Sequence, residues 1–439
     1  PGRYTFHDLI RAYATTRAHD QDAPPERRAA LTRLFDHYLH TTATAMNTLH
    51  PAETHLRPKI ATAGTPAPEL TDADIALSWL DTERPTLVAV AAHTATGGWS
   101  THTTRLSSIL HRYLIGGYFA DALTVHAHAH HAAQHTGDLI GQAHALTNLG
   151  HAHRQQDRYS LAADHLQRAL NLYEQTGDPV GRARALTNLG VVQTRLGRYH
   201  LATGHFENAL TLFRQAGERS GEAYALTNFG VVEQRLGHYP LAADHYQQAL
   251  TLYQQSGDRN GEAEALSGLG DVDVQLGRYG PAAEHLQKAL TLHRQLGNRG
   301  SEAWALDNLG TLHTRLGQPA QATEHHQQAL DTFREADVWG GEAHALNGLG
   351  EAAHTAGRPT DALDHHTAAH TIAADIGAPD QHARAHTGLA HAHHTLGNPD
   401  QARHHYQHAL TLYTQLGMPE TDQIRAHLTT LDNTSTKQR

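Results

Sequence analysis

The chain has 439 residues, is 39 % hydrophobic and carries a formal net charge of −10 at pH 7. This length exceeds one ordinary core, so the chain must form several domains or a repeat array whose core grows with length. No apolar run approaches the roughly 20 residues that cross a bilayer, and no basic stripe is present to neutralise phosphates, so we expect neither a membrane nor a nucleic acid as partner. Zero cysteines exclude disulfides and thiolate metal sites and agree with a cytoplasmic location.

Residues 1–50 are predicted to form a helical segment. A short amphipathic helix comes first, and a long helix follows from about residue 25 to residue 49. The apolar face of the short helix is predicted to consist of Phe6, Leu9, Ile10 and Tyr13. Residues 51–70 contain four prolines, which disfavour helix in the residues before them, and are predicted to be a linker.

Residues 71–100 are predicted to be a helical lead-in to the rest of the chain. Thr71 and Asp72 provide a helix cap, and a second helix is expected from Pro85 to Thr96. The lead-in therefore consists of two helices.

A 40-residue period governs the chain over residues 139–417. The motif Ala-Leu-x-x-Leu-Gly recurs without a slip in register, and the seventh copy is degenerate, with His386 and Ala390 at the Leu and Gly positions. A second motif, Ala-x-x-x-aromatic/Leu-x-x-Ala-Leu, follows each copy of the first. Both motifs place their apolar residues on one helical face, so each of the seven units is predicted to hold two amphipathic helices.

The ends of this array are predicted to differ from its middle. Residues 101–138 are expected to form a degenerate first repeat, with helices over 101–116 and 118–136. Residues 418–432 are predicted to be a polar capping helix, followed by a disordered tail over 433–439.

Small residues are predicted to control how the helices pack. Gly150 and Ala162 would let the two helices of a hairpin approach closely, and Ala169 would admit the next hairpin. Because a single hairpin cannot bury its apolar face alone, the units are expected to stack around one continuous core.

These motifs resemble the tetratricopeptide repeat in its 40-residue variety, which occurs in spindle-orientation adaptors of the Pins type and in many bacterial regulators. The resemblance covers seven units. It implies an all-α fold, a right-handed α-solenoid of tetratricopeptide helical hairpins with a helical N-terminal segment.

The leading segment carries a second resemblance. Arg3-Tyr4-Thr5-Phe6-His7-Asp8-Leu9 is similar to the tail of the winged-helix segment in STAND-class signalling ATPases, and residues 76–84 resemble the helix before the repeats of antibiotic-regulatory-protein activators with an apoptotic-ATPase-like core. This resemblance implies that the chain is the C-terminal sensor region of a bacterial transcriptional regulator. Its own upstream ATPase domain would then be a partner.

The resemblance also implies where a ligand binds. On the first helix of each unit, the residues opposite the packed face form a stripe, at positions 144, 148, 151 and 155 in the first copy, and in tetratricopeptide superhelices this face lines the concave groove. Asn amides hold an extended backbone, Arg forks onto carboxylates and exposed aromatics concentrate binding energy. The predicted groove residues are Asn148, Asn188, Asn228, Asn308, Arg195, Arg235, Arg315, Arg184, Tyr224, Trp304, His144 and His344.

An alternative is that the Asn residues only cap or solvate their helices. The two interpretations differ in what substitution does: if the groove binds a partner, replacing Asn188, Asn228 and Arg235 by Ala abolishes partner binding without unfolding the chain.

Histidine is unusually frequent, with 41 residues. One column on the second helices is predicted to hold half-buried residues that bridge adjacent hairpins, and a pH-sensing role is the alternative. The column consists of His165, His205, His245, His285, His325, His365 and His405. The pairs His126/His130, His131/His135 and His404/His408 have chelating spacing but no carboxylate or thiolate to complete a site, so no metal site and no cofactor are predicted.

The chain is predicted to be a non-catalytic ligand-sensing and protein-interaction superhelix that binds a peptide or protein segment in its groove. The alternative is a small-molecule sensor arm, for a sugar or metabolite, of a STAND ATPase regulator. An enzyme is not expected, because the sequence contains no nucleophile elbow, no His-Glu-x-x-His and no Gly-rich phosphate loop.

Overall fold

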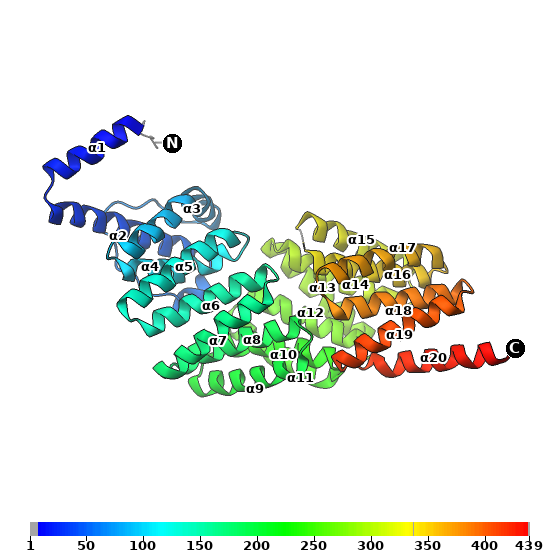
Figure 1. Ribbon diagram of the computed structural model, residues 1–439. Coiled ribbons are helices and arrows are strands. Elements are labelled where there is room, and N and C mark those ends of the chain that lie inside the picture. Colours follow the sequence, from blue (N-terminus) through cyan, green and yellow to red (C-terminus); the bar gives the residue numbers. More distant parts are fainter. Residues whose placement is uncertain (1–7, 337, 438–439) are drawn as a thin grey trace. The chain divides into compact units, whose positions relative to one another are not determined.

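The computed structural model describes residues 8–336 and 338–437, and within these residues every regular element is a helix (Figure 1). The predicted all-α fold class is confirmed. The chain divides into two compact units, Pro1–Thr176 and Gly177–Arg439. The division falls inside the array that the 40-residue period predicts to be continuous, so the periodic motif does not by itself fix how far one compact unit extends.

The N-terminal unit consists of a lead-in followed by two hairpins. Its elements are α1 (Asp8–Gln21), α2 (Pro24–Leu49), the short 3₁₀ helix η1 (Pro51–Leu56), α3 (Ala73–Thr96), α4 (Ser100–Leu114), α5 (Phe119–Thr136), α6 (Leu139–Gln155) and α7 (Tyr159–Thr176). Apolar residues of α2, α3, α4 and α5 form one buried cluster, which includes Phe35, Met46, Leu80, Leu87 and Leu110. The non-repetitive segment therefore has a core of its own with the first hairpin.

Helix α1 does not bury its predicted apolar face. Leu9, Ile10 and Tyr13 are 75 %, 52 % and 65 % exposed. Phe6, the fourth member of that face, lies outside the described residues.

The two predicted lead-in helices are one helix, α3, with Pro85 inside it. Asp72 caps its start by accepting from the Ile75 N–H (2.8 Å). Proline removes one hydrogen bond of the helix, but residues on both sides of it are buried, including Leu80 and Leu87. Packing of both halves against the same core therefore outweighs the break that proline favours.

The C-terminal unit consists of six hairpins and a last helix. The hairpins are α8 (Pro179–Arg195) with α9 (Tyr199–Ala216), α10 (Arg219–Arg235) with α11 (Tyr239–Ser256), α12 (Arg259–Gln275) with α13 (Tyr279–Leu296), α14 (Arg299–Arg315) with α15 (Pro319–Glu335), α16 (Trp339–Thr355) with α17 (Pro359–Asp375), and α18 (Pro379–Thr395) with α19 (Pro399–Leu416). The last helix, α20 (Glu420–Lys437), continues beyond the predicted cap into the segment expected to be a disordered tail.

Close approach at glycine sets the geometry within six of the hairpins, as predicted. A Cβ atom on Gly150 would lie 2.6 Å from Leu166 Cγ, and one on Gly190 would lie 2.7 Å from the Phe206 ring. The same contact recurs at Gly230, Gly270, Gly310 and Gly350. A methyl group at these positions would overlap the second helix, so the glycine allows the two helices to pack.

A polar contact repeats at four of the five junctions between hairpins of the C-terminal unit. An Arg or Gln side chain near the end of the second helix donates a hydrogen bond to the Glu side chain eight residues later. This Glu lies at the start of the first helix of the following hairpin. The pairs are Arg214 with Glu222 (2.7 Å), Gln254 with Glu262 (3.0 Å), Arg294 with Glu302 (2.9 Å) and Arg334 with Glu342 (2.8 Å). Because the donors are largely exposed, these contacts orient neighbouring hairpins more than they stabilise them.

The C-terminal unit curls until its late turns contact its early ones. A Cβ on Gly197, in the α8–α9 turn, would lie 2.5 Å from Leu416 Cδ2, and one on Gly237, in the α10–α11 turn, would lie 2.8 Å from Pro419. Arg235 at the end of α10 forms an ion pair with Asp380 at the start of α18 (3.0 Å). The row of first helices therefore forms a curved wall, and the residues that meet across it lie on its inner face.

Candidate ligand-binding face

Stripe residues of successive hairpins contact one another in the C-terminal unit. Trp304, His344 and Arg384 occupy the same repeat position, 40 residues apart, on α14, α16 and α18. The Trp304 and His344 rings lie edge to face with centroids 5.2 Å apart, and Arg384 Nη1 lies 3.3 Å from His344 Nε2. One repeat position therefore forms a continuous surface across three hairpins. We call this surface, together with the other stripe residues on the first helices of the C-terminal unit, the inner face.

A series of hydrogen bonds runs from Arg384 through His344 to Asp307 in the core. A guanidinium can only donate, so His344 Nε2 accepts from Arg384 and His344 Nδ1 carries the proton. Nδ1 then donates to Asp307 Oδ2 (2.5 Å), and the other oxygen of Asp307 pairs with His326 Nδ1 (2.6 Å). Burial alone would raise the pKa of Asp307, but the two imidazoles lower it well below its usual value, so this buried carboxylate stays charged.

Glu351 is the second acid of the inner face. It accepts from Arg384 Nε (2.7 Å), while its side chain remains 37 % exposed. Burial would raise the pKa of Glu351, but Arg384 and more distant cations outweigh this effect and bring the pKa to about 2. The inner face thus contains a fixed anion beside a fixed cation.

Arg235, a predicted groove residue, is engaged within the unit. Its partner Asp380 has a lowered pKa because Arg235 and the Gln381 amide outweigh the effect of burial. Burial would lower the pKa of Arg235, but Asp380 and, to a smaller extent, buried Tyr199 raise it. Replacing Arg235 therefore also removes the ion pair that links α10 to α18. A loss of binding in such a variant would not show that Arg235 contacts the ligand.

The Asn residues do not all project from the wall. Asn188 and Asn228 each donate Nδ2–H to the carbonyl four residues earlier on their own helix, at 3.0 and 2.8 Å. Asn188 Oδ1 is buried without a hydrogen-bond partner among the described residues. The helix-solvating interpretation thus accounts for one amide hydrogen of each residue.

The other predicted cations differ from Arg235. Arg195 and Arg315 are exposed and Arg184 is half-buried, and no hydrogen bond or ion pair with another described residue engages their guanidinium groups. Tyr224 and Asn308 are half-buried on the same stripe. Trp304 also packs against Phe333, with centroids 5.0 Å apart, so one side of its ring belongs to the core.

The remaining predicted residues, His144 and Asn148, lie on α6 in the N-terminal unit. His144 is exposed and its ring lies 5.7 Å from Tyr173, whereas Asn148 is half-buried. The candidate site described here is therefore confined to the C-terminal unit.

Sequence reasoning missed Arg384, Asp307 and Asp380. Arg384 stands one period after His344, so the 40-residue register could have identified it, but the degenerate motif of the seventh copy obscured that register. Asp380 gives no such signal, because its importance comes from a contact between residues 145 positions apart.

The histidine column is half-buried, as predicted. Five of its residues contact a side chain on the first helix of their own hairpin. His165 stacks on His153, His325 on His313 and His405 on His393, with centroids 5.2, 5.2 and 5.5 Å apart. His245 stacks on Phe229, and His285 pairs with Asp273. These contacts lie within single hairpins, and the bridging of adjacent hairpins by the column stays a prediction.

Models of the tetratricopeptide repeat match residues 145–180, 181–255, 261–335 and 341–415, which is more than half of the chain. The chain belongs to the tetratricopeptide-repeat family. These repeats give it the architecture of a regulatory protein-interaction module, and no catalytic family is among the matching models.

The predicted relationship to regulators is confirmed. The chain is 34 % identical to the regulatory protein AfsR of Streptomyces griseus over 179 residues, which is 39 % of this chain. That match spans only 18 % of the relative's own length.

Solved structures share the fold at low identity. A Rap conjugation gene regulator of plasmid pLS20, in complex with the Phr* peptide, is 13 % identical with a TM-score of 0.55, covering 76 % of this chain and 96 % of that one. A Rap protein complexed with Competence and Sporulation Factor is 14 % identical with a TM-score of 0.54, covering 80 % and 99 %.

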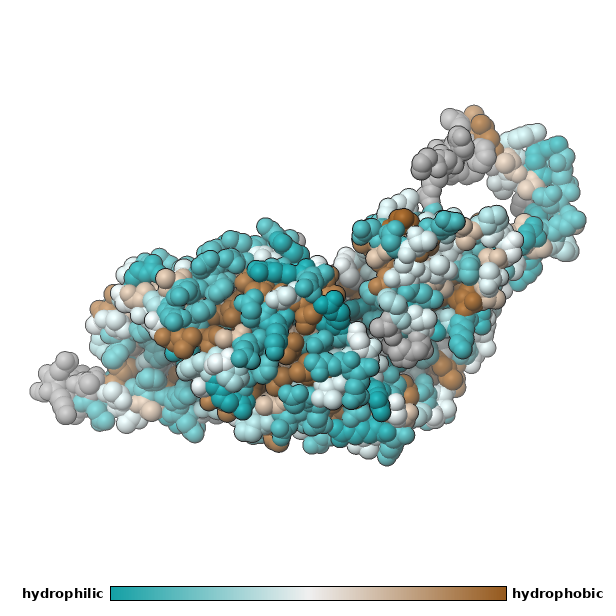
Figure 2. All heavy atoms as spheres, turned by 180° about the vertical axis from the view of Figure 1, so that it is seen from behind, coloured by the Kyte–Doolittle hydropathy of each residue, from teal (hydrophilic) through white to brown (hydrophobic). Residues whose placement is uncertain are grey.

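The surface is mixed in character. Figure 2 shows hydrophilic side chains over most of the face in view, with apolar atoms exposed in patches. Among the described residues, no helix combines the length and the apolar character needed to cross a bilayer.

Proposed function

We propose that the chain is a non-catalytic sensor that binds a peptide or protein segment along the inner face of its C-terminal unit. The observation that carries this proposal is the continuous surface from Trp304 through His344 to Arg384, which joins three hairpins. Its polar groups are held by one another, so a ligand meets a surface whose donors are already oriented, which reduces the entropic cost of binding.

The chemistry of the inner face favours a ligand that carries carboxylates. Arg195 and Arg315 are exposed with no partner among the described residues, and guanidinium groups bind carboxylates in a bidentate manner. Half-buried Tyr224 and Trp304 add aromatic surface on the same stripe. An acidic segment with an aromatic or aliphatic anchor fits this arrangement.

A small molecule is the second candidate ligand. The unit is closed by the Arg235–Asp380 ion pair and by the contact of Gly197 with Leu416. A closed wall favours this candidate, because it suits a compact ligand better than an extended peptide.

The similarity to AfsR supports a place for this sensor within a larger regulator. In that setting the chain would be the sensor region, and an upstream ATPase domain of the same protein would respond to ligand binding. The inner-face chemistry described above does not depend on this placement.

The test begins with selection of peptides from a random display library on the purified chain. We expect the selected peptides to be enriched in Asp and Glu. We expect Arg315→Gln to weaken their binding by at least about tenfold, as for other charge-assisted contacts. Arg259→Gln is the matched control, because Arg259 is exposed at the start of α12, away from the stripe.

The outcomes separate the candidates. Selected peptides that bind equally well to the Arg315 and Arg259 variants would contradict the inner-face proposal. If no peptide is selected, and a sugar or metabolite instead raises the melting temperature of the chain but not of the Arg315→Gln variant, the small-molecule alternative is correct.

A further inference from the structure

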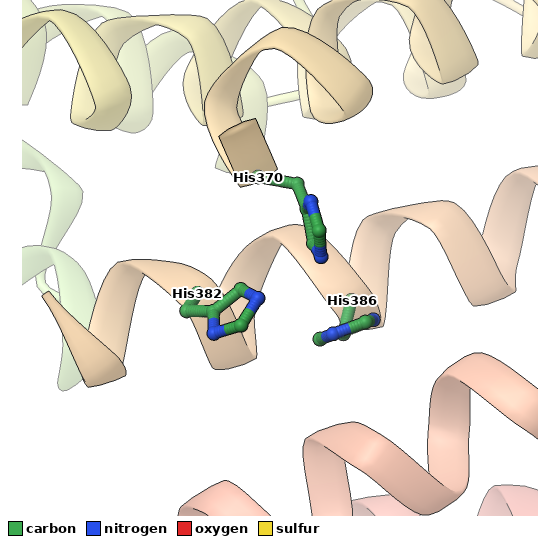
Figure 3. Close-up of side chains that lie close together, drawn as sticks. All are labelled: His370, His382 and His386. Atoms are coloured by element: carbon green, nitrogen blue, oxygen red, sulfur yellow. The ribbon is translucent and has the colours of Figure 1, made fainter. Parts of the chain in front are cut away.

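Three histidines converge where α17 meets α18, away from the inner face. His370 points from α17 toward His382 and His386, which lie one turn apart on α18 (Figure 3). One ring nitrogen from each lies within 4.8 Å of the other two. This trio was not among the histidine pairs that sequence spacing singles out, because His370 comes from a different helix.

The trio has the chemistry of metal ligands and not of an ion pair. Burial and neighbouring histidines lower the pKa values of all three, that of His386 to about 3, so the rings are neutral at pH 7 and their lone pairs are available. No carboxylate is among the groups that shift them. His382 Nε2 is buried and has no hydrogen-bond partner among the described residues.

A neighbouring ring fixes the orientation of His386. Its Nδ1 lies 2.9 Å from Nδ1 of His405, on α19, so one of these nitrogens donates to the other. With His386 Nδ1 as the donor, its Nε2 has a free lone pair and can act as a ligand, and a hydrogen bond donated by the other ring nitrogen is the usual support of a metal-bound imidazole. His408, also on α19, stacks on His386 with centroids 5.1 Å apart and is a fourth imidazole beside the trio.

We propose that His370, His382 and His386 bind one Zn²⁺ or a similar borderline divalent ion such as Ni²⁺ or Co²⁺. Neutral imidazoles suit these ions and not Mg²⁺ or Ca²⁺, which take oxygen ligands. Ligands at about 2.1 Å from a tetrahedral ion lie about 3.4 Å apart, so the nitrogens must draw together by no more than about 1.4 Å from the present limit of 4.8 Å. Rotation of half-buried His370 and His382 supplies this movement, and the ion then ties α17 to α18.

The test uses the full chain without a histidine tag, because the chain already contains 41 histidines. Zn²⁺ is titrated by calorimetry in the presence of a weak chelator that suppresses binding to single imidazoles. We expect one tight equivalent per chain and a rise in melting temperature. The His370→Gln/His382→Gln variant is expected to lose at least about tenfold in affinity.

His131→Gln/His135→Gln is the matched control, since it removes an exposed pair on α5 with chelating spacing. It should leave the tight equivalent unchanged. If both double variants bind Zn²⁺ as tightly as the original chain, the proposal fails. X-ray absorption of the unaltered Zn²⁺ complex gives a result that does not depend on variant folding: three imidazole ligands are expected, and a shell made mainly of oxygen overturns the proposal.

Discussion

At the scale of single residues, the inner face depends on Asp307. Its carboxylate is fully buried and accepts from His326 and His344. In Asp307→Asn one oxygen becomes an amide NH₂ that faces an imidazole N–H, so a buried donor loses its acceptor. We expect the free energy of unfolding to fall by about 3 kcal/mol, as when one partner of a buried pair is removed.

Urea unfolding measures this loss, with Asp375→Asn as control because Asp375 is exposed at the end of α17. The control should change the free energy by less than about 0.5 kcal/mol. If the two substitutions lowered the free energy of unfolding equally, the buried hydrogen bonds of Asp307 would contribute nothing specific to stability.

Buried histidines make stability depend on pH. Burial lowers the pKa of His126, of His293 to about 4 and of His366 to about 3, and all three side chains are at most 1 % exposed. These rings stay neutral in the folded chain but take up protons on unfolding below about pH 6.5. Their contribution to stability is therefore complete above pH 6.5 and is lost as the pH falls toward the folded-state pKa values, about 4 for His293 and about 3 for His366.

We expect each of these histidines to lower the free energy of unfolding at pH 5.5 by about 1 kcal/mol relative to pH 7.5. Urea unfolding at the two pH values measures the sum. A free energy of unfolding that is equal or higher at pH 5.5 is incompatible with neutral buried imidazoles.

At the scale of helices, glycine has opposite roles at two positions of one hairpin. A Cβ on Gly190 would overlap the Phe206 ring, whereas a Cβ on Gly204 meets nothing within 4 Å. We therefore expect Gly190→Ala to lower the free energy of unfolding by about 1 to 3 kcal/mol. Gly204→Ala, within α9, should raise it by about 0.5 to 1 kcal/mol through helix propensity.

Urea unfolding of both variants measures the difference in sign. Two stabilising substitutions would show that the first and second helices do not approach closely at Gly190.

Most helices of the repeats could be predicted from the sequence, because the 40-residue motif carries both the apolar faces and the turn glycines. The degenerate repeat illustrates this: its helices were expected over 101–116 and 118–136 and are Ser100–Leu114 and Phe119–Thr136. Continuous α3 could not be predicted, because local sequence records the cost of Pro85 but not the burial on either side of it. The length of α20 was missed for a related reason, since polar composition alone suggests a tail.

At the scale of the whole molecule, the period describes each hairpin but not where a compact unit begins or ends. The contact of Gly197 with Leu416, for example, joins turns that lie five hairpins apart in the C-terminal unit, and no local motif records it. The register identifies Trp304 and His344, which contact each other in the candidate site, and their contact with a ligand stays a prediction. Arg235 forms an ion pair with Asp380 that the sequence did not indicate, and Asp307 was not recognised.

The central claim is that a ligand lies against the inner face of the C-terminal unit, and site-directed photo-cross-linking tests it most directly. A photoreactive residue placed at Thr311, on the stripe of α14, should cross-link to a bound acidic peptide, and one placed at exposed Thr291, on the second helix α13, should not. Cross-linking from position 291 with none from position 311 would place the ligand on the opposite face and contradict the account.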